Sequence, residues 1–264
     1  MNLALAIYNK VDNQNFEDIG QSVVVVKNHL DLLDRFFNGF DNSDYFNGQP
    51  LAQLQCLNRA SEFVLRSEEN KKRFMDMVKR LKSAYDICCG SEELNQEHKD
   101  YVHFYLAIRS IVYKLTKGDA PDTEQMNAYV RDKVAAALES DGIEEIIKLG
   151  DEENKEQDIF DLDYLANIDK IKLPNTKIQL LQKVLSKAIG EMKKVNKIQG
   201  VVFSKKMQAV VDRYNERKDN VYSSEEFEAI ANELTNLIME LKDEFKAGDD
   251  LGIDFEEKAF YDIL

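Results

Sequence analysis

Apolar side chains recur at steps of three and four residues along most of this chain, and few helix breakers interrupt them. The 264 residues include three prolines and eleven glycines. Steps of three and four place each apolar set on one face of an α-helix. The shortage of proline and glycine favours long helices over strands joined by many turns. The pattern therefore predicts a mainly α fold, a multi-helix bundle with room for two helical subdomains.

Five apolar stripes define the clearest predicted helices. They are Phe16, Ile19, Val23, Val26, Leu30, Leu33 and Phe37; Tyr101, Phe104, Ile108, Ile111 and Leu115; Ile178, Leu181, Leu185, Met192 and Val195; Phe203, Met207, Val210 and Tyr214; and Phe227, Ile230, Leu234, Leu237, Leu241 and Phe245.

The first stripe contains a run of four valines at residues 23–26. Such β-branched residues disfavour a helix by about 0.5 kcal/mol each. Burying seven large apolar side chains stabilises by on the order of 10–20 kcal/mol before ordering entropy is subtracted. We therefore expect a helix packed against partners in a globular bundle, with a strand as the alternative.

Local signals mark where several helices begin or end. Ser223 with Glu226, and Thr176 with Gln179, have the spacing of a capping box, in which each residue bonds the backbone of the other. Gly142 is predicted to end a helix, because glycine readily takes the left-handed conformation found after a last turn.

A polar, mostly acidic run at residues 151–158 separates two parts of the chain with clearer apolar patterns. Charged runs of this kind are typical of exposed linkers. We therefore expect an N-terminal helical part at residues 1–149, an acidic linker at 150–158 and a C-terminal helical subdomain at 159–264.

Composition favours a folded cytoplasmic protein. The formal net charge is −14, and no apolar run approaches the roughly 18–20 residues that cross a bilayer. The first ten residues lack the features of a signal peptide. Cys56, Cys88 and Cys89 have neither disulfide-framework nor zinc-site spacing, so we expect reduced thiols.

Motifs for catalysis are missing from the sequence. No glycine is followed by lysine, as a phosphate-binding loop requires, and no Gly-x-Gly-x-x-Gly occurs. Glu-x-Lys tripeptides, which can complete a metal-dependent nuclease site, begin at Glu69, Glu153, Glu244 and Glu256. In so charged a chain we interpret them as solvated helix faces. We expect no catalytic, cofactor or metal site here, and keep a small metal-dependent hydrolase as an alternative.

The three histidines, His29, His98 and His103, give no metal-site pattern either. His98 and His103 are five residues apart, whereas four apart would align two imidazoles on one helix face.

Basic residues cluster in one segment of this acidic chain. Residues 187–218 hold nine basic and three acidic residues, a net of 9 − 3 = +6, and residues 66–82 hold seven and three, a net of 7 − 3 = +4. Basic patches on an acidic protein can contact phosphates or an acidic partner, because the local field rather than the net charge guides close encounter. The alternative is that they balance neighbouring acidic helices. Our candidate contact residues are Lys193, Lys194, Lys197, Lys205, Lys206, Arg213 and Arg217.

Several short words of sequence follow one another in the second half of the chain. They are Leu173-Pro174-Asn175-Thr176-Lys177, Phe203-Ser204, Asp212-Arg213-Tyr214-Asn215 and Glu256-Glu257-Lys258-Ala259-Phe260-Tyr261. In this order and spacing they resemble the C-terminal helical region of the restriction (R) subunit of type I restriction-modification enzymes.

The resemblance implies a parent protein larger than this chain, a type I site-specific deoxyribonuclease. Such a subunit carries a nuclease domain and two RecA-like motor domains, which use ATP and Mg²⁺ to translocate DNA. Its helical C-terminal region helps attach it to the methyltransferase and specificity subunits. We therefore expect a noncatalytic assembly module, truncated at both ends, that also contacts DNA. A freestanding helical scaffold or regulatory protein-interaction domain is the alternative.

Overall fold

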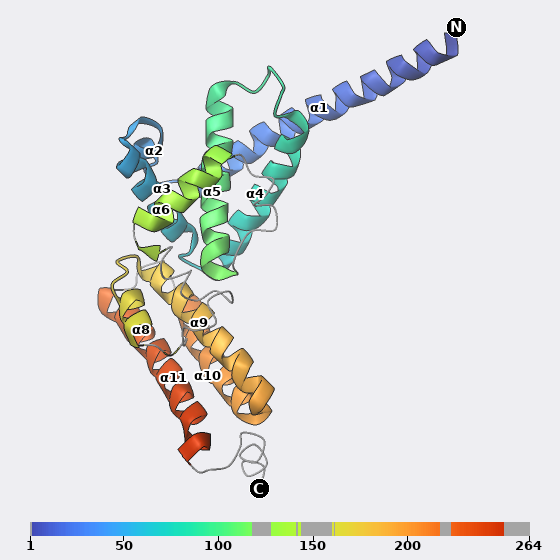
Figure 1. Cartoon of the computed structure of the whole chain (residues 1–264). Helices are drawn as coiled ribbons and strands as arrows, with labels where there is room; N and C mark the ends of the chain where they lie inside the picture. Colours follow the sequence, from blue (N-terminus) through green and yellow to red (C-terminus); the bar gives the residue numbers. More distant parts are fainter. Residues whose placement is uncertain are drawn as a thin grey trace. The chain divides into compact units, whose positions relative to one another are not determined.

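The computed structural model describes residues 2–117, 128–140, 142–143, 160, 162–216 and 223–250, and within these ranges it contains ten labelled helices and no strand (Figure 1). The mainly α prediction is confirmed. The helices are α1 (Asn2–Phe36), α2 (Ser43–Asn47), α3 (Pro50–Val64), α4 (Glu68–Cys88), α5 (Gln96–Thr116), α6 (Ala128–Ser140), α8 (Leu162–Asp169), α9 (Pro174–Val195), α10 (Lys197–Asn215) and α11 (Ser224–Asp250).

The chain divides into two compact units. The first comprises Met1–Val64, Glu68–Ile111 and Pro121–Ala137, and the second comprises Leu65–Ser67, Val112–Ala120 and Leu138–Leu264. The predicted acidic linker at 150–158 lies outside the described residues.

The valine run at residues 23–26 is helical, as predicted, and lies within α1. Val23 and Val26 are buried, whereas Val24 is 57% exposed and Val25 is 37% exposed. This alternation fits a helix with one face against α4, the helix on which α1 packs. Burial of one face therefore outweighs the low helix propensity of valine. The side chain of Phe16, the first member of this stripe, lies outside the described residues.

Aromatic side chains build the core of the first unit. The ring of Phe37, the residue directly after α1, stacks on Phe63 of α3 with centroids 5.2 Å apart. Phe74 of α4 meets it edge-on at 5.9 Å, and Tyr105 of α5 lies 5.7 Å away. Rings at these distances attract each other beyond their buried area. One residue thus joins four helices.

Three long helices form the second unit. α9 packs against both α10 and α11, these two also contact each other, and the short α8 lies against α9 (Figure 1). The predicted stripes of α9, α10 and α11 supply the core through residues such as Leu185, Phe203 and Leu234. The prediction of helices on these three segments is confirmed.

Two of the predicted helix ends are confirmed. The Ser223 backbone N–H donates to Glu226 Oε2 at 2.8 Å, and the Glu226 N–H donates to Ser223 Oγ at 3.3 Å. Gly142 follows α6 with φ +70° and donates its N–H to the Glu139 carbonyl at 3.0 Å.

The capping box predicted at Thr176 and Gln179 is wrong. α9 begins earlier, at Pro174, and Leu173 precedes it without a side-chain cap. Proline favours the first helical position, where its fixed φ suits the helix and its missing N–H is not needed. Thr176 is therefore already inside the first turn, where its side chain is buried.

Candidate interaction surface

The Leu173–Lys177 word lies at the start of α9 and faces inward. Its Asn175 is 5% exposed, and Asn175 Oδ1 lies 2.5 Å from the hydroxyl oxygen of Tyr214, which is 1% exposed. The same hydroxyl lies 3.1 Å from the backbone oxygen of Leu65. Buried polar groups need such partners, because an unpaired one is costly. Two of the words that carry the family resemblance therefore contact each other in the core.

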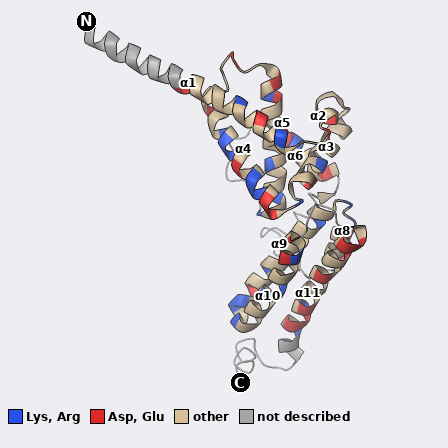
Figure 2. Cartoon of the chain, turned by 180° about the vertical axis from the view of Figure 1, so that it is seen from behind, with Lys and Arg blue, Asp and Glu red and all other residues tan. Residues whose placement is uncertain are grey.

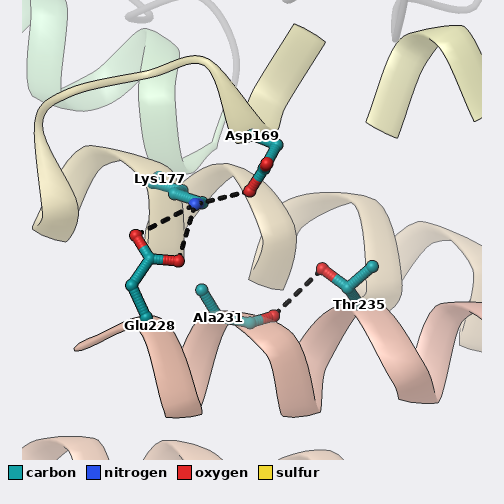
Figure 3. Close-up of polar contacts among 5 residues, drawn as sticks. All are labelled: Asp169, Lys177, Glu228, Ala231 and Thr235. Carbon is teal, nitrogen blue, oxygen red and sulfur yellow. Dashed lines mark hydrogen bonds and ion pairs between the residues drawn. The ribbon is translucent and has the colours of Figure 1, made fainter. Parts of the chain in front are cut away.

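Lys177, the last residue of that word, is held by two carboxylates (Figure 3). Its side chain is 6% exposed, and its Nζ lies 2.7 Å from Asp169 Oδ1 and 3.3 Å from Glu228 Oε2. Burial alone lowers the pKa of a lysine, but the hydrogen bonds and charges of Asp169 and Glu228 outweigh it and raise the pKa of Lys177. This ion pair connects the end of α8 and the first turns of α9 and α11.

The side chains for metal-dependent chemistry do not gather in the described parts of the chain, where no three His, Cys, Asp or Glu residues could hold an ion together. Glu69 and Glu244 lie on α4 and α11, and the other two Glu-x-Lys tripeptides are outside the described residues. His29 Nδ1 lies 2.8 Å from the Val25 carbonyl oxygen of its own helix. His103 meets the ring of Tyr85 edge-on, and its burial lowers its pKa.

The connection between α9 and α10 is tight because Asn196 caps α10, a cap that was not predicted from the sequence. Asn196 stands between the helices, and its side-chain oxygen accepts from the Gln199 N–H at 3.0 Å. Four residues later, a Cβ on Gly200 would lie 2.9 Å from the Lys193 Cα. Only glycine permits this approach, which places the start of α10 against the end of α9.

Three of the seven candidate contact residues are engaged in ion pairs. Lys194 pairs with Glu191 on its own helix at 2.7 Å, and Lys206 pairs with Glu240 of α11 at 2.7 Å. Arg213 pairs with Glu233, also on α11. The last two pairs balance charge between α10 and acidic α11, whose red residues are visible in Figure 2. Arg217 lies outside the described residues.

The other three candidates, Lys193, Lys197 and Lys205, are exposed and have no ion-pair partner in the described part of the chain. Lys193 belongs to the last turn of α9, Lys197 is the first residue of α10, and Lys205 lies two turns further along α10. The structure therefore divides the predicted basic set into paired and unpaired members.

Next to these lysines α10 exposes apolar side chains that the sequence analysis did not single out. Ile198 is 43% exposed, and Val201 and Val202 are each 40% exposed. With Lys205 they occupy steps of three, four and seven residues from Ile198, which is one face of a helix. We call Ile198, Val201, Val202 and Lys205 the α10 outer face.

The signal for this face was present in the sequence, because α10 carries two apolar stripes. One stripe, with Phe203, Val210 and Tyr214, is buried in the second unit. The other stripe, with Ile198, Val201 and Val202, is exposed. An exposed apolar stripe beside charged groups has the composition of a protein–protein contact, in which an apolar centre is rimmed by polar side chains.

Comparison with known proteins identifies the family. Residues 9–264 match the family described as type I restriction enzyme HindI endonuclease subunit-like, C-terminal. The chain therefore belongs to this family of C-terminal regions of type I restriction endonuclease subunits, and the resemblance predicted from its sequence words is confirmed.

A relative from Methanocaldococcus jannaschii, assigned as the type I restriction enzyme MjaIXP endonuclease subunit, is 23% identical to the chain over 249 residues. The match covers 94% of this chain but 23% of the relative, so the chain spans about a quarter of that protein. No solved structure matches the chain. Among the described residues, no helix has the length and apolar content that a membrane span requires.

Proposed function

We propose that this chain is a noncatalytic assembly module of a type I restriction endonuclease subunit, and that it attaches this subunit to the methyltransferase and specificity subunits. The family match and the relative's name support the parent enzyme. The α10 outer face, with the unpaired lysines Lys193 and Lys197 beside it, is the observation that carries the attachment role.

The composition of this surface favours a protein partner. Burying the exposed apolar area of Ile198, Val201 and Val202 contributes about 25 cal/mol per Å² removed from water. The lysines add electrostatic complementarity to an acidic partner, which raises the association rate and fixes orientation. When the assembled complex binds DNA, the same lysines also contact that DNA in this proposal.

ATP and Mg²⁺, which the resemblance implies for the parent protein, belong in this proposal to motor domains outside this chain. The sequence offers no Gly-Lys phosphate loop for them. The 23% coverage of the relative leaves most of that protein's length for such domains.

The test is the affinity of the 264-residue chain for the purified methyltransferase–specificity complex of the same system, measured by calorimetry. We expect Lys193→Glu/Lys197→Glu/Lys205→Glu to weaken binding at least tenfold, because three attractive contacts become repulsive. Ile198→Ser/Val201→Ser/Val202→Ser should weaken it similarly at high salt, where apolar contacts persist and charge is screened.

The matched control is Lys117→Glu/Lys170→Glu/Lys172→Glu, which makes the same charge change at exposed residues of the second unit that lie outside α9 and α10. We expect near wild-type affinity for this control. Equal affinity for all four proteins would refute the assignment of this surface, and absence of binding by the wild-type chain would refute the attachment role.

A further inference from the structure

A second basic surface lies on α4, in the first unit. One side of α4 is buried through Phe74, Val78 and Leu81. On other sides, two of its lysines are neutralised within the helix, since Lys71 pairs with Glu68 at 2.6 Å and Lys82 pairs with Asp86 at 2.7 Å. The other four basic residues of α4 are not part of these ion pairs.

Those four cations have no such neutralisation. Lys72, Arg73, Lys79 and Arg80 are exposed and form no ion pair in the described part of the chain. Lys72 and Arg73 precede Lys79 and Arg80 by seven residues, which is about two helical turns or roughly 10 Å along the same side of the helix. With Asp76 between them the surface has a net charge of 4 − 1 = +3. We call these five residues the α4 basic face.

A groove continues this face onto α1. It has a volume of about 520 Å³, and Lys79, Arg80 and Ser83 of α4 line it together with Ser22 and Val25 of α1. Asp76 also lines the groove, so the lining holds two cations and one carboxylate. Of its two hydroxyls, that of Ser83 is exposed and donates to the Lys79 carbonyl at 3.1 Å, whereas Ser22 is 8% exposed. Lysine, arginine and serine are among the side chains that bind phosphate oxygens in nucleic acids.

We propose that the α4 basic face binds the sugar–phosphate backbone of a nucleic acid. Its chemistry differs from that of the α10 outer face, because the exposed positions of α4 from residue 72 to residue 83 carry no apolar side chain. A protein partner would be expected to meet an apolar centre. Among the residues that line the groove, Val25 and Ile87 are the exposed apolar side chains.

Backbone binding also agrees with the overall charge. A chain at −14 repels nucleic acid at long range, so attraction must come from a local concentration of unpaired cations. Contacts to phosphates carry no sequence information, and the surface should therefore bind irrespective of base sequence. This proposal concerns the first unit and does not rest on the attachment role of α10.

The test is fluorescence anisotropy of a labelled DNA duplex of mixed sequence titrated with the full 264-residue chain. Salt is varied from about 50 to 200 mM, because each phosphate contact adds about 0.9 to the slope of log K against log salt. We expect Lys72→Gln/Arg73→Gln/Lys79→Gln/Arg80→Gln to bind at least tenfold more weakly than the wild type. Loss of four contacts should lower the magnitude of the slope by about 3.6.

The control Lys117→Gln/Lys170→Gln/Lys172→Gln/Lys246→Gln removes four exposed positive charges from the second unit, none of them at a candidate contact residue, and should keep at least a third of the wild-type DNA affinity. Circular dichroism should show equal thermal unfolding for all three proteins. Unchanged DNA affinity in the α4 variant would overturn the proposal, and so would undetectable binding by the wild type. Equal binding of poly-glutamate would also overturn it, since the face would then be a site for acidic polypeptides.

The DNA-binding test and the test of the attachment role can fail independently of each other. Affinity for the methyltransferase–specificity complex is measured without DNA and depends on α10 variants. Affinity for the duplex is measured without partner proteins and depends on α4 variants.

Discussion

The hydroxyl oxygen of Tyr214 lies 2.5 Å from Oδ1 of Asn175, and both side chains are buried in the second unit. Asn175 belongs to the Leu173–Lys177 word at the start of α9, and Tyr214 belongs to the Asp212–Asn215 word at the end of α10. The residues that mark the family thus hold two helices together. Asn175 and Tyr214 are both buried, and the surfaces that we propose for binding lie elsewhere on α10 and α4.

Replacement Tyr214→Phe should lower the free energy of unfolding by about 1–3 kcal/mol, because it leaves a buried amide and the Leu65 carbonyl without this hydroxyl. Urea denaturation followed by circular dichroism measures the change. Tyr129→Phe, at a residue that is 54% exposed, is the control and should change stability by less than about 0.5 kcal/mol. Equal effects of the two substitutions would show that the buried contact contributes nothing.

Removing the two carboxylates that pair with Lys177 should destabilise the fold more than removing the lysine itself. Asp169→Asn/Glu228→Gln leaves a buried ammonium without its carboxylates and should destabilise by about 2–4 kcal/mol. Lys177→Met removes the buried charge itself and should stay within about 1 kcal/mol of the wild type. Chemical denaturation of the three proteins at neutral pH decides this, and a larger loss for Lys177→Met would contradict it.

The same lysine should give stability a dependence on alkaline pH. Its pKa in the folded chain is raised above the ordinary value of 10.5, so the folded state binds the proton more tightly than the unfolded state. The contribution is complete below that ordinary value and is lost as the pH rises through the folded value. The stability difference between the wild type and Lys177→Met should therefore be constant from neutral pH to about pH 10 and shift against the wild type above it. A difference that does not change up to about pH 12 would disprove the raised pKa.

Gly200 should not tolerate a side chain. A Cβ there would lie 2.9 Å from the Cα and backbone nitrogen of Lys193, so Gly200→Ala must separate α10 from α9 and should destabilise by about 1–3 kcal/mol. Gly190→Ala is the control, since a Cβ at Gly190 meets nothing within 4 Å. As an interior helix position it should be neutral or stabilised by up to about 1 kcal/mol. Thermal unfolding that ranks the two variants the other way would contradict the close approach.

The long helices were predictable from the sequence, because their apolar stripes extend over several turns. The alternative of a strand at residues 23–26 fails because burying one face of the helix outweighs the low helix propensity of valine. The sequence predicted the cap at Ser223, where both partners are local. It misplaced the start of α9, because two signals competed and the proline at position 174 prevailed over Thr176. Local signals are therefore reliable only where one of them acts alone.

The candidate surface was only half predictable. Sequence shows that Lys197, Lys205 and Lys206 are basic, but ion pairing depends on which helix packs opposite. Glu240 is 34 residues from Lys206 along the chain and lies 2.7 Å from it in the folded unit. The exposure of Val201 and Val202 likewise depends on which of the two apolar stripes of α10 packs into the core. The periodicity of the sequence does not distinguish the buried stripe from the exposed one.

The most direct test of the assembly role is lysine-acetylation footprinting of the chain, free and bound to the methyltransferase–specificity complex, read out by mass spectrometry. We predict that Lys193, Lys197 and Lys205 lose at least fivefold in acetylation rate on binding, while exposed Lys170 and Lys172 keep theirs. A complex that forms with unchanged rates at Lys193, Lys197 and Lys205, or with protection confined to Lys170 and Lys172, would contradict the account.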